Sequence, residues 1–284
     1  MKLTDAIDLL LIEGKSRRLS PRTIEMYVEK LGRLRQYLGD VETSSISIHQ
    51  LREFLSTVPI RSGPRYYQCI RRLFRFLVSE ELLEKNPALR LRRPRVRELV
   101  IEPLTGDEIQ RLFATARSSM PQMRLRDTTI LATLLGTGIR AGELIALRDE
   151  DVRVHSLLIN GKGDRQRIIP LPLKLSRMLI KYRALRPQGN VAAFFRKRTG
   201  EALSYNHLDV IFRRLSEASR VKVWPHRCRH TFASAFMSEP GANVLALQAI
   251  CGWRVLAMAN RYAKVSYAAL AASMDAHSPI NALL

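Results

Sequence analysis

Residues 89–105 read LRLRRPRVRELVIEPLT and interrupt the helical patterning of the chain. Basic residues stand at nearly alternate positions, two prolines remove backbone donors, and no apolar stripe of helical period is present, which is typical of an extended linker. Helical patterns lie on both sides of it. A chain of 284 residues is long enough for two domains of ordinary size. We therefore predict a helical domain over 1–88, a basic linker over 89–102 and a second domain over 103–284.

The first domain carries four helical patterns, at residues 3–13, 20–38, 47–55 and 64–79. The second pattern begins with a Ser-Pro pair, which is typical of a helix N-terminus, and the third begins with a capping box formed by Ser47 and Gln50. One face of the second pattern is expected to pack on the other helices through Ile24, Val28, Leu31 and Leu38. The sequence predicts a small helical bundle.

The fourth pattern has two faces of different chemistry. Its apolar face holds Ile70, Leu73, Phe74 and Leu77, and its opposite face holds Arg65, Arg71, Arg72 and Arg75. Residues 61–97 contain eleven basic residues and three acidic ones, and no acidic residue lies in 61–79. Because an ordinary solvated face mixes signs, we expect this face to contact phosphates. The linker arginines are expected to follow a phosphate backbone in the same way: Arg92, Arg93 and Arg95.

The composition favours a nucleic-acid partner. The chain has 47 Lys and Arg against 26 Asp and Glu, a formal charge of +21, which attracts polyanions such as nucleic acids or membrane surfaces. No apolar run approaches the ~20 residues of a spanning helix, and the LLLI run near the N-terminus is too short for a signal peptide. The cysteines lie far apart without metal-ligand spacing, which favours a reducing compartment. We expect a soluble cytoplasmic protein.

The second domain opens with a capping box, Thr105 to Glu108, and is mainly helical. One interruption, LLINGKGDRQRIIPL, has β-type apolar residues on either side of a Gly-Lys-Gly-Asp turn. This pattern predicts a hairpin with Lys162 at or near its tip. The expected fold class is therefore mainly α with a small β-hairpin.

Three further segments carry polar side chains with candidate chemistry. In LLGTGIRAGELIAL, Arg140 starts a helix and Glu143 follows one turn later on the same face. In WPHRCRHTFASAF, His226 and Arg229 lie in a first helical turn, where positive charge opposes the helix dipole and needs an anionic partner. In CGWRVLAMANRYAKV, Tyr262 either packs its ring or attacks a substrate. Taken singly, each segment is also compatible with an ordinary structural role.

Taken in order, these segments resemble the tyrosine recombinases, also called the phage integrase family. TGIRAGEL is similar to the family's first arginine box, NGKGDRQRIIPL to its hairpin lysine, HRCRH to its His-x-x-Arg box and LQAICGWRVLAMANRY to its final box. SPRTIEMY is similar to part of its helical core-binding domain. The resemblance covers nearly the whole chain. It implies a core-binding domain and a catalytic domain that form a C-shaped clamp on DNA.

The resemblance also implies a reaction. Tyr262 would attack a DNA phosphodiester and form a 3′-phosphotyrosyl link, while Arg140 and Arg229 stabilise the negative charge that builds on the phosphate oxygens. A phenol has an ordinary pKa near 10, so proton transfer at the nucleophile is assigned to His226. The link keeps the bond energy, so strand rejoining would need neither nucleotide nor metal, and we expect no cofactor.

Lys162 would protonate the departing 5′ oxygen, and Glu143 would orient its neighbours. The final box departs from the commonest pattern, because Trp253 stands nine residues before the tyrosine where most members have histidine. Cre-type members share this variant. An indole donates a hydrogen bond but cannot take up a proton, so Trp253 is expected to bind the scissile phosphate and to position the nucleophile. Tyr205 and Tyr267 are expected to pack.

The implied partner is double-stranded DNA with paired inverted half-sites, bound by a homotetramer on two duplexes. Residues 266–276 either dock on a neighbouring subunit or pack on their own domain. We expect no further arm-binding domain before the bundle and therefore a system that acts on short paired sites.

Three other classes of protein would explain part of the pattern. A DNA-binding regulator would leave the arginine, histidine and tyrosine motifs without a purpose. A type IB topoisomerase would use similar phosphate chemistry, but the compact N-terminal helical domain favours a recombinase. A metal-dependent nuclease is disfavoured by the lack of a close-spaced acidic motif.

Overall fold

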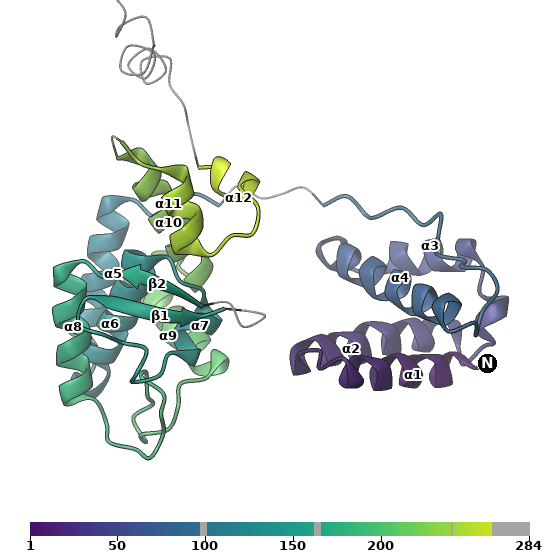
Figure 1. Ribbon diagram of the computed structural model, residues 1–284, viewed down its shortest axis with the longest axis horizontal. Coiled ribbons are helices and arrows are strands. Elements are labelled where there is room, and N and C mark those ends of the chain that lie inside the picture. The colour runs from purple at the N-terminus through teal and green to yellow at the C-terminus, as the bar shows by residue number, and fades with distance from the viewer. Residues whose placement is uncertain (97–100, 162–165, 240, 263–284) are drawn as a thin grey trace, which may run out of the picture. The chain divides into compact units, whose positions relative to one another are not determined.

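The computed structural model describes residues 1–96, 101–161, 166–239 and 241–262, and the chain divides into two compact units, Met1–Leu99 and Val100–Leu284 (Figure 1). Each unit has its own hydrophobic core. No helix of the described part is long and apolar enough to cross a membrane.

The N-terminal unit is a helical bundle, as the sequence predicts. Its described elements are α1 (Leu3–Ser16), α2 (Pro21–Leu38), the 3-10 turn η1 (Thr43–Ser45), α3 (Ile48–Thr57), the 3-10 turn η2 (Ile60–Ser62) and α4 (Gly63–Ser79). The Ser20 hydroxyl accepts a hydrogen bond from the Thr23 N–H, which starts α2 where expected. The capping box of Ser47 and Gln50 is also confirmed.

The buried face of α2 differs from the expectation at one position. Val28 is 51% exposed, whereas Tyr27 and Leu34 are buried together with Leu31. These buried residues follow the spacing i, i+4, i+7, and α2 packs on α1, α3 and α4 along that stripe. Ile24 is half-buried against Gly14 of α1, whereas Val28 lies outside the buried stripe, so the prediction for Val28 was wrong.

The apolar face of α4 is buried as predicted, with Ile70, Leu73, Phe74 and Leu77 in the core. Its arginines are not equivalent. Arg65 and Arg75 are exposed, whereas Arg71 donates a hydrogen bond to the Tyr67 hydroxyl at 2.8 Å. Arg72 contacts both carboxylate oxygens of Glu13 at 2.7 Å, and this ion pair ties α4 to α1.

The first part of the segment after α4 packs on the N-terminal unit. Residues 91–96 form neither helix nor strand, and Leu91 is buried in the N-terminal core. Pro94 lies against the start of α4, where a Cβ added at Gly63 would meet the proline Cβ at 3.2 Å. Arg92, Arg93 and Arg95 are exposed.

The C-terminal unit is built mainly from helices and one hairpin. Its described elements are α5 (Gly106–Ser118), α6 (Pro121–Thr137), α7 (Ala141–Ala146), β1 (Ser156–Asn160), β2 (Gln166–Pro170), α8 (Leu173–Leu185), α9 (Tyr205–Ser219), α10 (Pro225–Ser238), α11 (Val244–Cys251) and α12 (Ala257–Asn260). The capping box of Thr105 and Glu108 starts α5 as predicted.

Helix α6 is the central helix of this unit, because it contacts α5, α7, α8 and α10. Its second half is buried and contains threonines at every fourth position. Thr129, Thr133 and Thr137 each donate a hydrogen bond to the carbonyl four residues earlier, at 2.7, 2.7 and 2.6 Å. These bonds satisfy the hydroxyls inside the core, so the helix can be buried on several sides.

The hairpin is antiparallel, with Ser156 opposite Pro170 and Asn160 opposite Gln166 (Figure 1). Leu157, Ile159 and Ile169 are buried on one face. Arg167 stands opposite Ile159, and paired residues of an antiparallel ladder point to the same side. The described fold is therefore mainly α with a two-stranded sheet, which confirms the expected fold class.

Candidate active site

Most of the predicted catalytic residues lie near the junction of α7, α10 and α11. Arg140 is the N-cap of α7, and Glu143 is in the first turn of that helix. Arg229 lies on α10, Trp253 follows α11, and Tyr262 follows α12. Distant segments of the chain therefore converge on the end of α11.

Three consecutive backbone carbonyls at the end of α11 each accept a hydrogen bond from a different arginine. The pairs are Arg167 Nε with Ile250 O at 2.8 Å, Arg229 Nη2 with Cys251 O at 2.8 Å, and Arg140 Nη2 with Gly252 O at 3.1 Å. The last carbonyls of a helix lack partners within the helix and carry the negative end of its dipole, so they bind cations. We call these three arginines the arginine clamp.

Glu143 is the anion that joins two arginines of the clamp. Its carboxylate accepts hydrogen bonds from the Arg140 backbone N–H at 2.9 Å and from Arg140 Nη1 at 2.8 Å. Arg167 Nη1 and Nη2 bind the same carboxylate at 3.0 and 2.8 Å. Burial alone would raise the pKa of Glu143, but the bonds from Arg167 and Arg140 hold that pKa below its ordinary value. The carboxylate is therefore charged at neutral pH and fixes both guanidiniums.

Arg229 is the most buried arginine of the clamp, with 3% of its surface exposed. Its Nη1 also donates to Gly138 O at 2.7 Å. Gly138 has a left-handed backbone, with φ of +62°, and a Cβ there would lie 2.3 Å from the Phe232 ring. Only glycine meets both conditions, which accounts for the Gly-Thr-Gly break before Arg140.

Gly252 is constrained in a similar way at the other side of the clamp. Its φ is +61°, and a Cβ on it would lie 2.9 Å from Arg167 Nη1. The left-handed residue ends α11 and turns the chain toward Trp253. A side chain at this position would displace the guanidinium that binds Glu143.

A row of rings extends from Arg229 to the surface. The Arg229 guanidinium lies 5.1 Å from the Trp253 ring centroid, and the Trp253 and Tyr262 rings are stacked at 5.5 Å with an interplanar angle of 9°. The His230 ring lies 5.0 Å from the Tyr262 ring, and His226 lies 5.5 Å from His230. Tyr262 thus contacts both an indole and an imidazole.

The titrating groups of this row favour their neutral forms. Burial raises the pKa of the Tyr262 phenol, against the opposite effect of Arg261 and Arg229. Burial and the nearby charges of Arg229 and Arg140 lower the pKa of His226. At neutral pH the site therefore contains a protonated phenol and an unprotonated imidazole, which can accept a proton.

A cavity of roughly 1200 Å³ opens beside the clamp, and its lining includes Arg140, Arg167 and Trp253. Tyr205 also lines it, with 46% of its surface exposed. The Tyr205 hydroxyl lies against α7, because a Cβ on Gly142 would be 2.2 Å from the hydroxyl oxygen. Over the described residues, no group of three or more His, Cys, Asp or Glu is placed to hold a metal ion.

Some predicted residues lie elsewhere. Lys162, Tyr267 and the segment 266–276 lie outside the described residues. The predicted DNA-binding arginines Arg65, Arg71, Arg72, Arg75, Arg92, Arg93 and Arg95 belong to the N-terminal unit. Their role in DNA binding therefore stays a prediction.

Two residues of the site are absent from the sequence prediction. Arg167 belongs to the clamp, and the available signal was its position two residues before the buried Ile169, which puts both side chains on one face of β2. His230 follows Arg229 directly in HRCRH, so it could have been considered with that motif. The imidazole next to Tyr262 is that of His230, and His226 is one ring farther away.

Comparison with known proteins identifies the family of this chain. The model of the phage integrase family matches residues 102–269, which include the arginine clamp, Trp253 and Tyr262. The chain is 30% identical over 265 residues to tyrosine recombinase XerA of Thermococcus kodakarensis, covering 90% of this chain and 87% of that protein. It is 27% identical over 279 residues to tyrosine recombinase XerC of Alcanivorax borkumensis, covering 94% and 91%.

Solved structures share the fold. A λ integrase fragment, 75–356, crystallised as a dimer bound to a COC′ core site, has a TM-score of 0.75 at 20% identity and covers 93% of this chain and 96% of that chain. The XerH recombinase bound to a palindromic difH substrate has a TM-score of 0.72 at 20% identity, covering 93% and 82%. The family match over more than half of the chain, together with these relatives, shows that this protein belongs to the phage integrase family, the tyrosine recombinases.

Proposed function

We propose that this recombinase cuts and rejoins DNA through a covalent 3′-phosphotyrosyl link at Tyr262. The observation that carries the proposal is the arginine clamp beside the stacked tyrosine. Arg140 and Arg229 bind adjacent carbonyls, and Trp253 connects Arg229 to Tyr262. Guanidiniums fixed before the reaction are suited to stabilise a charged transition state without reorganisation.

Both catalytic arginines retain donors for a phosphate. A guanidinium has five N–H groups, and the side-chain hydrogen bonds described above use two from Arg140 and two from Arg229. In the proposed step, a bond forms between the Tyr262 oxygen and phosphorus while the bond to the 5′ oxygen breaks. The remaining N–H groups would bind the non-bridging oxygens, which carry extra negative charge in the transition state.

Proton transfer completes the step. The Tyr262 phenol loses its proton, and we assign His226 as the acceptor because its lowered pKa keeps the imidazole neutral. His230 lies between the two rings and is the alternative acceptor. Lys162 would give a proton to the departing 5′ oxygen, and Glu143 would orient the arginines. Attack by a 5′ hydroxyl on the phosphotyrosine then restores the DNA without a nucleotide or a metal.

The proposed working form is a homotetramer that holds two duplexes in a strand exchange. A solved relative with a TM-score of 0.75 is a λ integrase tetramer bound to a Holliday junction. We propose that both units of one chain bind each half-site and enclose the duplex in a C shape. Two inverted half-sites would make one target. The reaction would take place in the cytoplasm.

The proposal is tested by sequencing the DNA that flanks the coding region for an inverted repeat and placing two copies of that repeat on a supercoiled plasmid. Site-specific recombination predicts products in which the DNA between the sites is excised or inverted, depending on their orientation. A topoisomerase would relax the plasmid without exchanging flanks, and a regulator would bind it without changing its topology. Either of these outcomes on a bound two-site substrate would contradict the proposal.

A further inference from the structure

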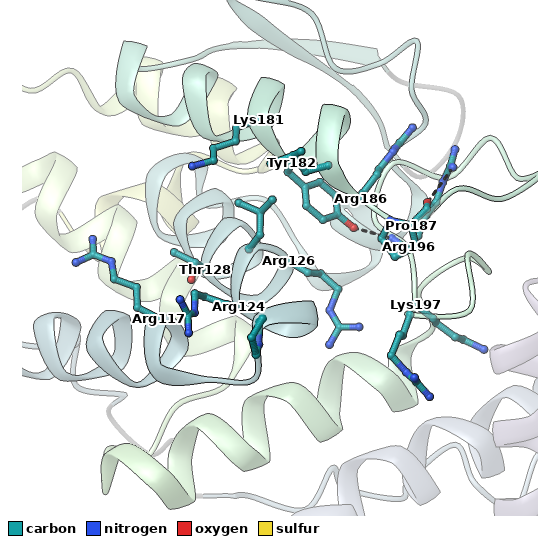
Figure 2. Close-up of a pocket in the computed structure, with 14 residues that line it drawn as sticks. Arg117, Arg124, Arg126, Thr128, Lys181, Tyr182, Arg186, Pro187, Arg196 and Lys197 are labelled. Carbon is teal, nitrogen blue, oxygen red and sulfur yellow. Dashed lines mark hydrogen bonds between the residues drawn. The ribbon is translucent and has the colours of Figure 1, made fainter.

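A second cavity lies at the other end of α6, in the same unit as the clamp (Figure 2). Its volume is roughly 610 Å³, and it is formed by the first turns of α6, the last turn of α8 and the chain around 196–198. Helix α6 has 17 residues, so at ~1.5 Å per residue its two ends are about 25 Å apart. The catalytic Arg140 follows the far end, so this cavity is separate from the proposed active site.

The lining of this cavity is strongly basic. It contains eight basic residues and no acidic one: Arg117, Arg124, Arg126, Lys181, Arg186, Arg196, Lys197 and Arg198. Apolar side chains, among them Leu125, Leu185 and Pro187, lie between them.

Some of these charges already have partners. Arg186 and Arg196 are buried and share the Asp149 carboxylate, with nitrogen-oxygen distances of 2.6 and 3.1 Å. Arg126 binds the buried Asp127 at 2.8 Å. By contrast, Arg124, Lys181 and Arg198 are exposed, and their side chains have no hydrogen-bond or ion-pair partner in the described part of the chain. Three cations at the rim are therefore available to a ligand.

Thr128 supplies an independent observation. It lines the cavity with 9% of its surface exposed, and Figure 2 shows it among Arg117, Arg124 and Lys181. Its hydroxyl is buried and has no hydrogen-bond partner among the described residues, unlike the hydroxyl of Thr129 beside it. An unpaired buried hydroxyl destabilises the folded protein, so a polar group that reached it would be bound favourably.

We propose that this cavity binds an acidic peptide segment of another protein, with an apolar side chain between the α6 and α8 walls and flanking carboxylates on Arg124, Lys181 and Arg198. The free cations come from three separate segments, α6, the end of α8 and the chain at 198, and apolar side chains line the same cavity. A single phosphate would need donors that converge on one point, and the buried arginines that could converge are already bound to Asp149. Separate carboxylates along a peptide match the spread arrangement.

The test uses a fluorescein-labelled peptide with the sequence Asp-Glu-Asp-Leu-Phe-Glu-Asp-Asp and fluorescence anisotropy on the full chain. We expect saturable binding that weakens with salt. Reversing two rim charges, Arg124→Glu with Lys181→Glu, should weaken binding by about tenfold or more. The matched control is Lys174→Glu with Arg177→Glu, which makes the same charge change on exposed residues of α8 outside the cavity. Equal weakening in both variants would contradict a site at this cavity.

Thr128→Val gives a second readout, because it removes the hydroxyl and nearly keeps the shape. Removal of an unpaired hydroxyl should leave the melting temperature unchanged or raise it, while peptide binding weakens by a few fold. Unchanged peptide binding would show that Thr128 takes no part. Displacement of the peptide by an equal concentration of half-site duplex, with loss of DNA binding in the rim variant, would identify a DNA site and overturn the proposal. Peptide binding requires no DNA cleavage, so this test does not depend on the proposed reaction.

Discussion

The two exposed arginines of α4 and the arginines of the clamp show two uses of one residue type, free in solvent and fixed by protein contacts. Arg65 and Arg75 on α4 are exposed, whereas Arg229 is buried and Arg167 is largely buried. The clamp arginines bind backbone carbonyls and Glu143, which fixes their positions. An exposed arginine keeps its rotamer freedom until it meets a phosphate, and a fixed one has already lost that freedom.

This difference predicts that the exposed arginines contribute to DNA affinity and the fixed arginines to the cleavage rate. Exposed arginines neutralise phosphates and release counterions, which contributes to binding along any duplex. Fixed arginines beside the nucleophile act most strongly where charge develops in the transition state. We therefore expect changes in the clamp to reduce the cleavage rate with little loss of half-site binding, and changes on α4 to do the reverse.

Among changes that keep Tyr262, Trp253→Phe should lower the cleavage rate most. Phenylalanine keeps a ring between Arg229 and Tyr262 but lacks the indole N–H that we expect to bind the scissile phosphate. Loss of one such donor typically lowers the rate by ~10²- to 10³-fold. Single-turnover cleavage measures the contribution of the hydrogen bond, and thermal melting measures the contribution of packing.

Trp253→His is the matched control for that change. It restores a ring donor but fills less space, so it should keep much of the cleavage rate and lower the melting temperature. If Trp253→Phe cleaves as fast as the parent protein, the hydrogen bond is dispensable and the tryptophan acts through its shape.

Arg167 tests whether the clamp needs its third member. Arg167→Met removes the contacts with Glu143 and Ile250, and the cleavage rate should fall by ~10²-fold while half-site affinity stays within about twofold. Arg167→Lys should recover part of the rate, because it returns the charge without the two-pronged contact. Arg177→Met, on an exposed residue of α8, is the control. Equal losses of binding and rate would indicate a general folding defect.

The two histidines can be separated by pH. A neutral imidazole accepts the tyrosine proton, so the rate should fall as pH drops through the lowered pKa of His226, which lies below the ordinary value near 6.5. His226→Asn should be slower and should lack this acid limb, whereas His230→Asn should keep it. The opposite pattern in a pH series of single-turnover rates would assign proton acceptance to His230.

Arg65 and Arg75 should have the smallest effect on rate. Replacing both with Met should leave single-turnover cleavage at saturating protein nearly unchanged. Half-site binding should become less dependent on salt, with a slope that falls by about 0.9 for each phosphate that the variant no longer neutralises. Gel shifts at several salt concentrations measure this slope. An unchanged slope would remove these two arginines from the DNA-binding surface.

The sequence predicts local features well and distant contacts poorly. Capping residues such as Ser47 and Thr105 start helices where expected, because a cap depends on residues three positions apart. The burial of Val28 was mispredicted because two overlapping stripes on α2 are both apolar, and only packing on the neighbouring helices selects between them.

Arg167 shows that the sequence also fails to predict long-range contacts in the active site. Its partners are Glu143, 24 positions away, and Ile250, 83 positions away, so no local pattern identifies the contact. Arg140 and Glu143 were found as a pair because they lie one helical turn apart. The motifs thus indicate which residues belong to the site, while the clamp that fixes them requires the fold.

Covalent capture tests the central role of Tyr262 most directly. A suicide duplex, nicked close to the cleavage position, loses a short strand after attack and leaves the protein attached to a 3′ phosphate. The parent chain should give an adduct that survives denaturation, and Tyr262→Phe should bind the duplex with the same affinity and give none. An adduct in Tyr262→Phe, mapped by peptide mass to another residue such as Tyr267, would contradict the assignment of the nucleophile.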